Sequence, residues 1–207
     1  MPLPTPAPSA TAFADSVVVI TGAASGIGQA TAEAFVSSGA HAVLLDHDAA
    51  QLATTAQALG AATAVYGDVA RWAGLSSGFP GCSGDRPPGA GAGQQRRDVP
   101  GQGRRRHTGQ LGHQPRCQRQ GTALMAASIA PLLQAAGGGA IANLASVSGL
   151  LRPAHRWTYN ASKGAILALT RCQALDLARH NIRVNSVSPG TIWTPELDRM
   201  THGDCAG

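Results

Sequence analysis

A strand, a glycine-rich turn and a helix follow one another near the N-terminus, and this order constrains the fold more than any other feature. Val17–Ile20 is a β-branched run, the turn over residues 21–28 has glycines at positions 22, 26 and 28, and residues 29–38 show helical periodicity. Such glycines permit a tight turn, a close approach of backbone N–H groups to phosphate, and close helix–strand packing. An accidental glycine-rich loop is the alternative, but a second strand follows at the expected distance. The pattern therefore predicts an α/β fold with a doubly wound parallel sheet.

Asp46 ends that second strand, which covers residues 41–45. An aspartate at this place accepts hydrogen bonds from the adenosine ribose of a dinucleotide and repels a 2′-phosphate. Because no Arg or Lys lies in the glycine turn or beside Asp46, NAD is favoured over NADP. The alternative is that Asp46 caps a helix over residues 49–59. A third strand, over residues 64–67, brings Asp68 and Val69 to the same edge of the sheet.

Lys163 is the only lysine among the 16 basic residues of the chain, and Tyr159 precedes it by four positions. Residues at this spacing share one face of a helix. An ammonium beside a phenol favours the phenolate and lowers the phenol's pKa from roughly 10, which suits a general acid/base. Ser146 lies at the tip of a predicted strand over residues 140–146. The alternative is that Tyr159 and Lys163 are ordinary exposed helix residues.

The length of 207 residues suits one domain over residues 15–207, after a disordered Pro-rich extension over residues 1–14. The four cysteines show neither metal-ligand nor disulfide spacing, and no apolar run reaches the roughly 20 residues that span a membrane. We therefore expect a cytoplasmic protein without a metal site or a membrane partner. Residues 71–120 hold nine Arg and two Asp, whereas the rest of the chain has seven basic and nine acidic residues. Because the basicity belongs to one segment, we expect no nucleic-acid partner.

Several motifs occur in the order and spacing of one family: the glycine turn, Asp46, Asp68–Val69, Ser146, Tyr159 with Lys163, and residues 189–194. Through these motifs, which cover residues 15–69 and 121–199, the chain resembles a classical short-chain dehydrogenase/reductase. The resemblance implies a Rossmann-type sheet and NAD(P)-dependent hydride transfer between a secondary alcohol and a ketone. It also implies a small-molecule alcohol or ketone as substrate and a homo-oligomer, a dimer or a tetramer, with helices paired between subunits.

The same resemblance implies a role for each motif residue. Tyr159 is implied as the acid/base, Ser146 as the residue that orients the substrate oxygen, and Lys163 as the holder of the nicotinamide ribose. Asn143 is implied to support the site from behind the strand. The implied cofactor-binding residues are Gly22, Ser25, Gly26, Ile27, Gly28, Asp46, Asp68, Val69, Tyr159, Lys163, Pro189, Ile192 and Thr194. The substrate stays open among sugars, polyols, steroids and simple ketones.

Residues 71–120 depart from the family. They hold eleven Gly, five Pro and no Ile, whereas a buried parallel strand is normally a near-continuous apolar run. The family's fourth strand, its Asn-Asn-Ala-Gly motif and its catalytic Asn are expected in this segment and are not found. After Met200 the family's last helices and seventh strand are not found either. We therefore expect an incomplete sheet, with the fourth and seventh strands missing or disrupted.

A shifted reading frame accounts for the anomalous segment. One base downstream, residues 91–97 can encode Val-Leu-Val-Asn-Asn-Ala-Gly, which is the family's strand and motif. In the same frame residues 117–121 can encode Val-Asn-Val-Lys-Gly, with the catalytic Asn in place of Gln118. We hypothesise two compensating single-base shifts, one between about residues 70 and 90 and the other near Gly121. The alternative is a genuine disordered insertion.

Three functions follow from these observations. The first is the oxidoreductase, and the alternative is a catalytically inactive, frame-shifted or truncated remnant that at most binds nucleotide. Nucleic-acid binding through the Arg-rich segment is a remote alternative, because that segment lacks interleaved aromatic residues. Loss of several buried aliphatic side chains, at roughly 1.5–3 kcal/mol each, would rival the roughly 5–15 kcal/mol that stabilise a domain. We therefore expect the chain as written to be unstable or inactive.

Sequencing of the coding DNA across codons 70–121 tests the frame hypothesis directly. We expect two compensating single-base differences that restore the family motifs. A verified sequence that still encodes Gln94-Gln95-Arg96-Arg97 in frame would contradict the hypothesis.

Overall fold

The computed structural model describes residues 9–69, 91–94, 113–151, 153–154, 156–195 and 197–198, and only the backbone of residues 91–94 and 113–117. Residues 10–15 form turns ahead of the first strand. Phe13 anchors them: its N–H donates to the Ser38 carbonyl at 2.8 Å, and its ring lies edge-on to Phe35 with centroids 4.8 Å apart. Residues 10–14 of the predicted extension therefore form turns that Phe13 anchors, and its residues 1–8 lie outside the described part of the chain.

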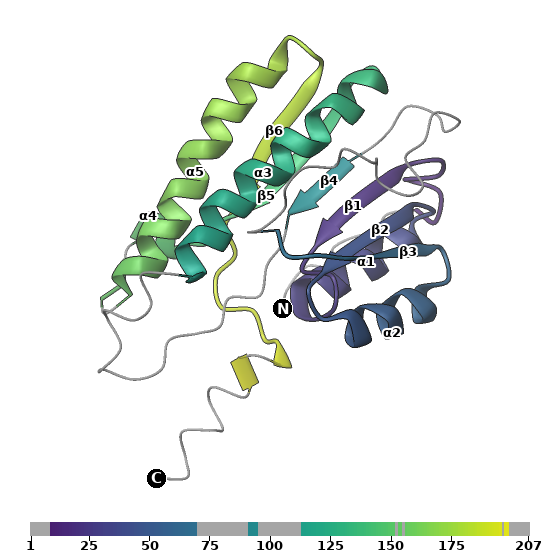
Figure 1. Ribbon diagram of the computed structural model, residues 1–207, viewed down its shortest axis with the longest axis horizontal. Helices are drawn as coiled ribbons and strands as arrows, with labels where there is room; N and C mark the ends of the chain where they lie inside the picture. Colours follow the sequence, from purple (N-terminus) through teal and green to yellow (C-terminus); the bar gives the residue numbers. More distant parts are fainter. Residues whose placement is uncertain are drawn as a thin grey trace.

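The described strands form one parallel sheet in the order β3-β2-β1-β4-β5-β6 (Figure 1). Their bounds are β1 (Val17–Thr21), β2 (His41–Asp46), β3 (Ala62–Tyr66), β4 (Gly91–Gln94), β5 (Gly139–Leu144) and β6 (Ile182–Val187). The order reverses between β1 and β4, and ligands of such sheets bind at the carboxyl ends of the strands beside this reversal. The predicted doubly wound parallel sheet is confirmed, and its ligand edge is the one where β1, β2 and β5 end.

Helices cover the sheet on both sides (Figure 1). They are α1 (Gly26–Ser37), α2 (Ala49–Leu59), α3 (His113–Ala135), α4 (Ser148–Leu151) and α5 (Trp157–Ala178). Glycines follow the ends of α1 and α2 with positive φ, +93° at Gly39 and +69° at Gly60, a conformation that glycine adopts without a steric penalty. Within the described residues, no helix combines the length and the apolar character that a membrane crossing requires.

Alternation along the strands sorts the apolar side chains into two clusters, because successive residues of a strand point to opposite faces. Val18 and Ile20 of β1 pack with α1 and α2, in a cluster that includes Ala32 and Leu52. Val17 and Val19 point to the other face, in a cluster that joins β1 and β2 to α3, β5 and β6. This second cluster contains Met125, Ile129 and Leu133 of α3, Ile141 of β5, and Ile182 and Val184 of β6. It spans the strand-order reversal, whereas the first cluster does not.

β4 lies in the middle of the sheet, where the composition predicts a missing or disrupted strand. Gly91–Gln94 pairs with β1, with Val18 opposite Gly91, and with β5, with Gln94 opposite Asn143. Of the two predicted outcomes, missing or disrupted, the strand is not missing at these four residues, because backbone groups make the ladder and large side chains are not needed for it. The strand occupies the place where the shifted frame encodes Val-Leu-Val-Asn. The prediction for the seventh strand falls on residues outside the described part of the chain.

Leu44→Ala should lower the free energy of unfolding by about 2–5 kcal/mol, because Leu44 of β2 is 0% exposed and its truncation leaves a cavity. Leu175→Ala is the matched control on α5. Since Leu175 is 80% exposed, we expect a change within about 0.5 kcal/mol. Urea unfolding followed by circular dichroism measures both variants, and equal losses would contradict the core assigned to β2.

Candidate active site

The glycine turn connects β1 to α1 at the ligand edge of the sheet. Gly22 and Gly26 have φ of 67° and 58°, in the left-handed region that L side chains rarely adopt. A Cβ on Gly28 would overlap the carbonyl oxygen of Gly22, so only glycine lets α1 start this close to β1. The N-cap residue of α1, Ser25, makes no side-chain capping bond. The first turn of α1 therefore presents its backbone N–H groups at a place suited to a phosphate.

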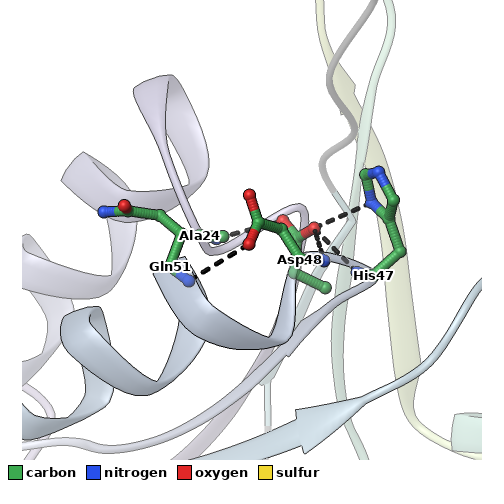
Figure 2. A network of polar contacts seen from close by, with 5 residues as sticks. Ala24, His47, Asp48 and Gln51 are labelled. Carbon is green, nitrogen blue, oxygen red and sulfur yellow. Dashed lines mark hydrogen bonds and ion pairs between the residues drawn. The ribbon is translucent and has the colours of Figure 1, made fainter.

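Asp46 ends β2 beside this turn and is fixed by three backbone N–H groups. Its Oδ2 accepts from Ala24 at 3.1 Å, and its Oδ1 accepts from His47 at 2.7 Å and from Asp48 at 3.1 Å. The imidazole Nδ1 of His47 lies 2.9 Å from the same Oδ1. Asp48 accepts from the N–H of Gln51 at 3.1 Å and caps α2 (Figure 2). The alternative that Asp46 is the N-cap is therefore wrong, and Asp46 joins the end of β2 to the glycine turn.

The chain after β3 reaches the same edge. The N–H of Gly67 donates to the Asp46 carbonyl at 2.9 Å, and Asp68 and Val69 follow directly. A Cβ on Gly121 of α3 would lie 2.8 Å from Cγ2 of Val69. Glycine at position 121 thus lets α3 pack against Val69, and both predicted residues directly follow the backbone contact with Asp46.

Tyr159 and Lys163 lie in the first two turns of α5. Nζ of Lys163 is 5.7 Å from the centroid of the Tyr159 ring and donates to the carbonyl of Leu144, the last residue of β5, at 3.0 Å. Lys163 is only 3% exposed, and burial of an ammonium is costly unless hydrogen bonds compensate it. The alternative of ordinary exposed helix residues is therefore wrong for Lys163.

Ser146 follows β5 and is 7% exposed. Its Oγ accepts from the N–H of Ser148 at 3.2 Å. A Cβ on Gly149 would come within 2.8 Å of the backbone of Lys163, so α4 and α5 approach closely. These contacts hold Ser146 and Lys163 at the same end of β5.

The segment after β6 returns to the glycine turn. The carbonyl of Pro189 accepts from the N–H of Val147 at 3.1 Å, which ties the segment to the neighbourhood of Ser146. Thr194 lies at its far end, with Cγ2 3.5 Å from the position of a Cβ on Gly26. Ile192 is 47% exposed. The predicted residues 189–194 therefore link the Ser146 end of the site to the phosphate end.

Asn143 was predicted to support the site, but three polar residues near it, Thr170, Gln173 and His47, were not predicted from the sequence. Asn143 is 0% exposed, and its Nδ2 donates to Thr170 Oγ1 and Gln173 Oε1, both at 2.9 Å. Thr170 and Gln173 are three residues apart and so share one face of α5. This spacing of polar residues is the sequence feature that could have identified them as partners of a strand asparagine. For His47, the feature that could have identified it is its position directly after Asp46. Gln118, at the place where the family's catalytic Asn is expected, is 5% exposed in α3.

Within the described residues, no three His, Cys, Asp or Glu side chains group in a way that could hold a metal ion. A glycine turn at the strand-order reversal and a buried lysine beside a tyrosine define the class of nucleotide-dependent oxidoreductases built on a Rossmann-type sheet. Family comparisons bear on this class at both ends of the chain. Residues 16–82 match the family described as short chain dehydrogenase, and residues 116–205 match that described as Enoyl-(Acyl carrier protein) reductase. Residues 83–115, between the two matches, lie within the anomalous segment.

Full-length relatives extend the similarity across the chain. It is 36% identical to the uncharacterized oxidoreductase YxbG of Bacillus subtilis, over 90% of this chain and 70% of the relative. It is 34% identical to the L-fucose dehydrogenase of Mus musculus, over 92% of this chain and 70% of the relative. The chain therefore belongs to the short-chain dehydrogenase/reductase family.

Solved structures show the same fold. The 3-ketoacyl-(acyl-carrier-protein) reductase of Brucella melitensis, complexed with NADH, has a TM-score of 0.74 at 24% identity, over 90% of this chain and 80% of that one. The L-sorbose reductase of Gluconobacter frateurii, complexed with NADPH and L-sorbose, has a TM-score of 0.77 at 24% identity, over 95% of this chain and 78% of that one.

Gly28→Ala should weaken NADH binding by about tenfold or more, because the added methyl overlaps the Gly22 carbonyl and forces α1 away from β1. Gly164→Ala is the control, since a Cβ there would make an ordinary contact 3.7 Å from the Gly149 carbonyl. Fluorescence titration with NADH measures both. Binding by Gly28→Ala that matches the unsubstituted chain would contradict the assigned phosphate site.

Proposed function

We propose that the chain catalyses the NAD-dependent interconversion of a secondary alcohol and a ketone, with Tyr159 as the general acid/base. The observation that carries this proposal is the burial of Lys163 between the Tyr159 ring and the carbonyl of Leu144. A lysine that only served solubility would be exposed, as lysines mostly are. Its position instead supplies positive charge beside the phenol, at the end of the strand that leads to Ser146.

The side chains divide the proton chemistry between them. The Lys163 ammonium favours the phenolate form of Tyr159, so the Tyr159 oxygen takes the proton from an alcohol hydroxyl and returns it to a carbonyl oxygen in reverse. Ser146 Oγ accepts from the N–H of Ser148, which leaves its own O–H to donate to the substrate oxygen. A bound nicotinamide supplies the hydride acceptor or donor. Asn143, with Thr170 and Gln173, keeps β5 and α5 in register behind these groups.

The residues at the ligand edge fit a nicotinamide dinucleotide. None of the three turn glycines readily accepts a side chain: Gly22 and Gly26 have a positive φ, and a Cβ on Gly28 would overlap the Gly22 carbonyl oxygen. The turn therefore stays free of side chains, and the N-terminus of α1 beside it suits a pyrophosphate. We assign NAD over NADP because the Asp46 carboxylate would repel a 2′-phosphate. Asp68 and Val69 would lie at the adenine, and Pro189, Ile192 and Thr194 at the nicotinamide.

For the substrate we propose a secondary hydroxyl of a sugar or polyol. The support is the relative named L-fucose dehydrogenase, which is 34% identical to this chain. Three large apolar side chains lie in the chain between Ser146 and Tyr159 and are exposed: Leu150, Leu151 and Trp157 are 54%, 78% and 74% exposed. Such side chains could pack against the C–H face of a sugar ring.

A second candidate is a protein that binds the dinucleotide without turnover. It is favoured by the composition of β4, Gly-Ala-Gly-Gln, and by Gln118 at the place of the family's catalytic Asn. Both candidates predict NADH binding, and only the first predicts turnover. The homo-oligomer that the family resemblance implies stays a prediction for either candidate.

Tyr159→Phe should lower kcat for L-fucose oxidation by about 10²–10⁴-fold, because it removes the acid/base oxygen, while NADH binding persists. Tyr66→Phe is the control: Tyr66 is the only other tyrosine and is 69% exposed at the end of β3. The measurements are NADH absorbance during turnover and NADH binding by fluorescence. Binding without turnover in the unsubstituted chain, over a panel of sugars and polyols, would contradict the first candidate in favour of the second.

A further inference from the structure

We propose that His47 is a second determinant of nucleotide choice, acting together with Asp46. When its imidazole is protonated, His47 offsets the charge of the Asp46 carboxylate and weakens the repulsion of a 2′-phosphate. NADPH therefore binds better relative to NADH as the pH falls. This inference rests on the proposed nucleotide site, because it concerns the adenosine end of that site.

The geometry places the two groups in direct contact but in different surroundings. Nδ1 of His47 lies 2.9 Å from Oδ1 of Asp46, and the side chain of Asp46 is 2% exposed whereas that of His47 is 62% exposed. The carboxylate is fixed by the N–H groups of Ala24, His47 and Asp48. The imidazole is therefore the exposed partner of a buried carboxylate that three backbone N–H groups hold in place. A phosphate that approaches Asp46 from solvent meets this ring.

His47 is also the one group of this edge that can become a cation, among the residues that the structure describes there. The glycine turn over residues 21–28 and the body of α2 have no charged side chain, and the segment over residues 188–194 has none either. The ends of β2 and β3 contribute three carboxylates, Asp46, Asp48 and Asp68, and the exposed phenol of Tyr66. Glu33, the charged residue of α1, lies two turns along that helix. No described Lys or Arg of these segments competes with His47 for the role.

The expected size of the effect follows from the charges. A 2′-phosphate carries a charge of about −1.5 to −2 near neutral pH. While the imidazole is neutral, the described charged groups near this phosphate are carboxylates, which repel it. Histidine side chains change charge in the range of about pH 5–8. One added positive charge several ångströms from the phosphate, in surroundings between bulk water and a protein surface, should change relative affinity roughly three- to tenfold.

The phosphate itself gains a proton with a pKa of about 6, so the test needs a variant in which only this contribution remains. The dissociation constants of NADH and NADPH are measured by fluorescence titration at about pH 6 and about pH 8, at low and constant ionic strength. The proteins are the full chain, His47→Asn, His47→Gln and His180→Asn. His180 is a partly exposed histidine in the turn between α5 and β6, at the opposite end of the strands, and so serves as the control.

In the unsubstituted chain, we expect the dissociation constant of NADPH divided by that of NADH to be lower at about pH 6 than at about pH 8. This decrease should be roughly three- to tenfold larger than in either His47 variant. His180→Asn should behave as the unsubstituted chain, and added salt should reduce the difference. Identical pH dependence with and without His47 overturns this inference while NADH binding continues to support the nucleotide site. If the full chain binds neither nucleotide at either pH, the inference and the proposed function both fail.

Discussion

The close approach of α1 to the carbonyl oxygen of Gly22 is the constraint on which the ligand edge depends. It is possible only because position 28 has no side chain. Once the start of α1 is held there, the N–H of Ala24 faces the end of β2, and Asp46 fixes it with a hydrogen bond of 3.1 Å. Thr194, far along the chain, packs beside Gly26. Three segments from distant parts of the sequence therefore meet around one backbone contact.

The catalytic end is held by a different set of contacts, which join α5 to β5 and to α4. Asn143 bonds two side chains of α5, Lys163 bonds the last carbonyl of β5, and Gly149 lets α4 lie against the backbone of Lys163. The apolar cluster that contains Met125, Ile129 and Leu133 of α3 also includes residues of β1, β2, β5 and β6. This cluster connects the nucleotide half of the sheet to the catalytic half across the short β4.

Residue type and order were sufficient to predict the sheet, the glycine turn and the ends of most elements. The start of the first helix was predicted less well: α1 begins at Gly26 rather than residue 29, because the first turn of a helix needs no apolar periodicity. The cap of α2 was considered only as an alternative role for Asp46, and the structure gives that role to Asp48 instead. β4 could not be predicted from an apolar run, since its ladder uses backbone groups alone. The contact between His47 and Asp46 depends on a side-chain rotamer, which no sequence pattern specifies.

The burial of Lys163 has a consequence for chemical labelling. It is the only lysine in the chain and is 3% exposed, with its amine hydrogen-bonded to the Leu144 carbonyl. An acylating reagent can therefore reach a side-chain amine only when α5 separates from β5. The rate at which this one position is labelled then reports how often that pair opens, and a bound nucleotide that steadies the pair slows the labelling.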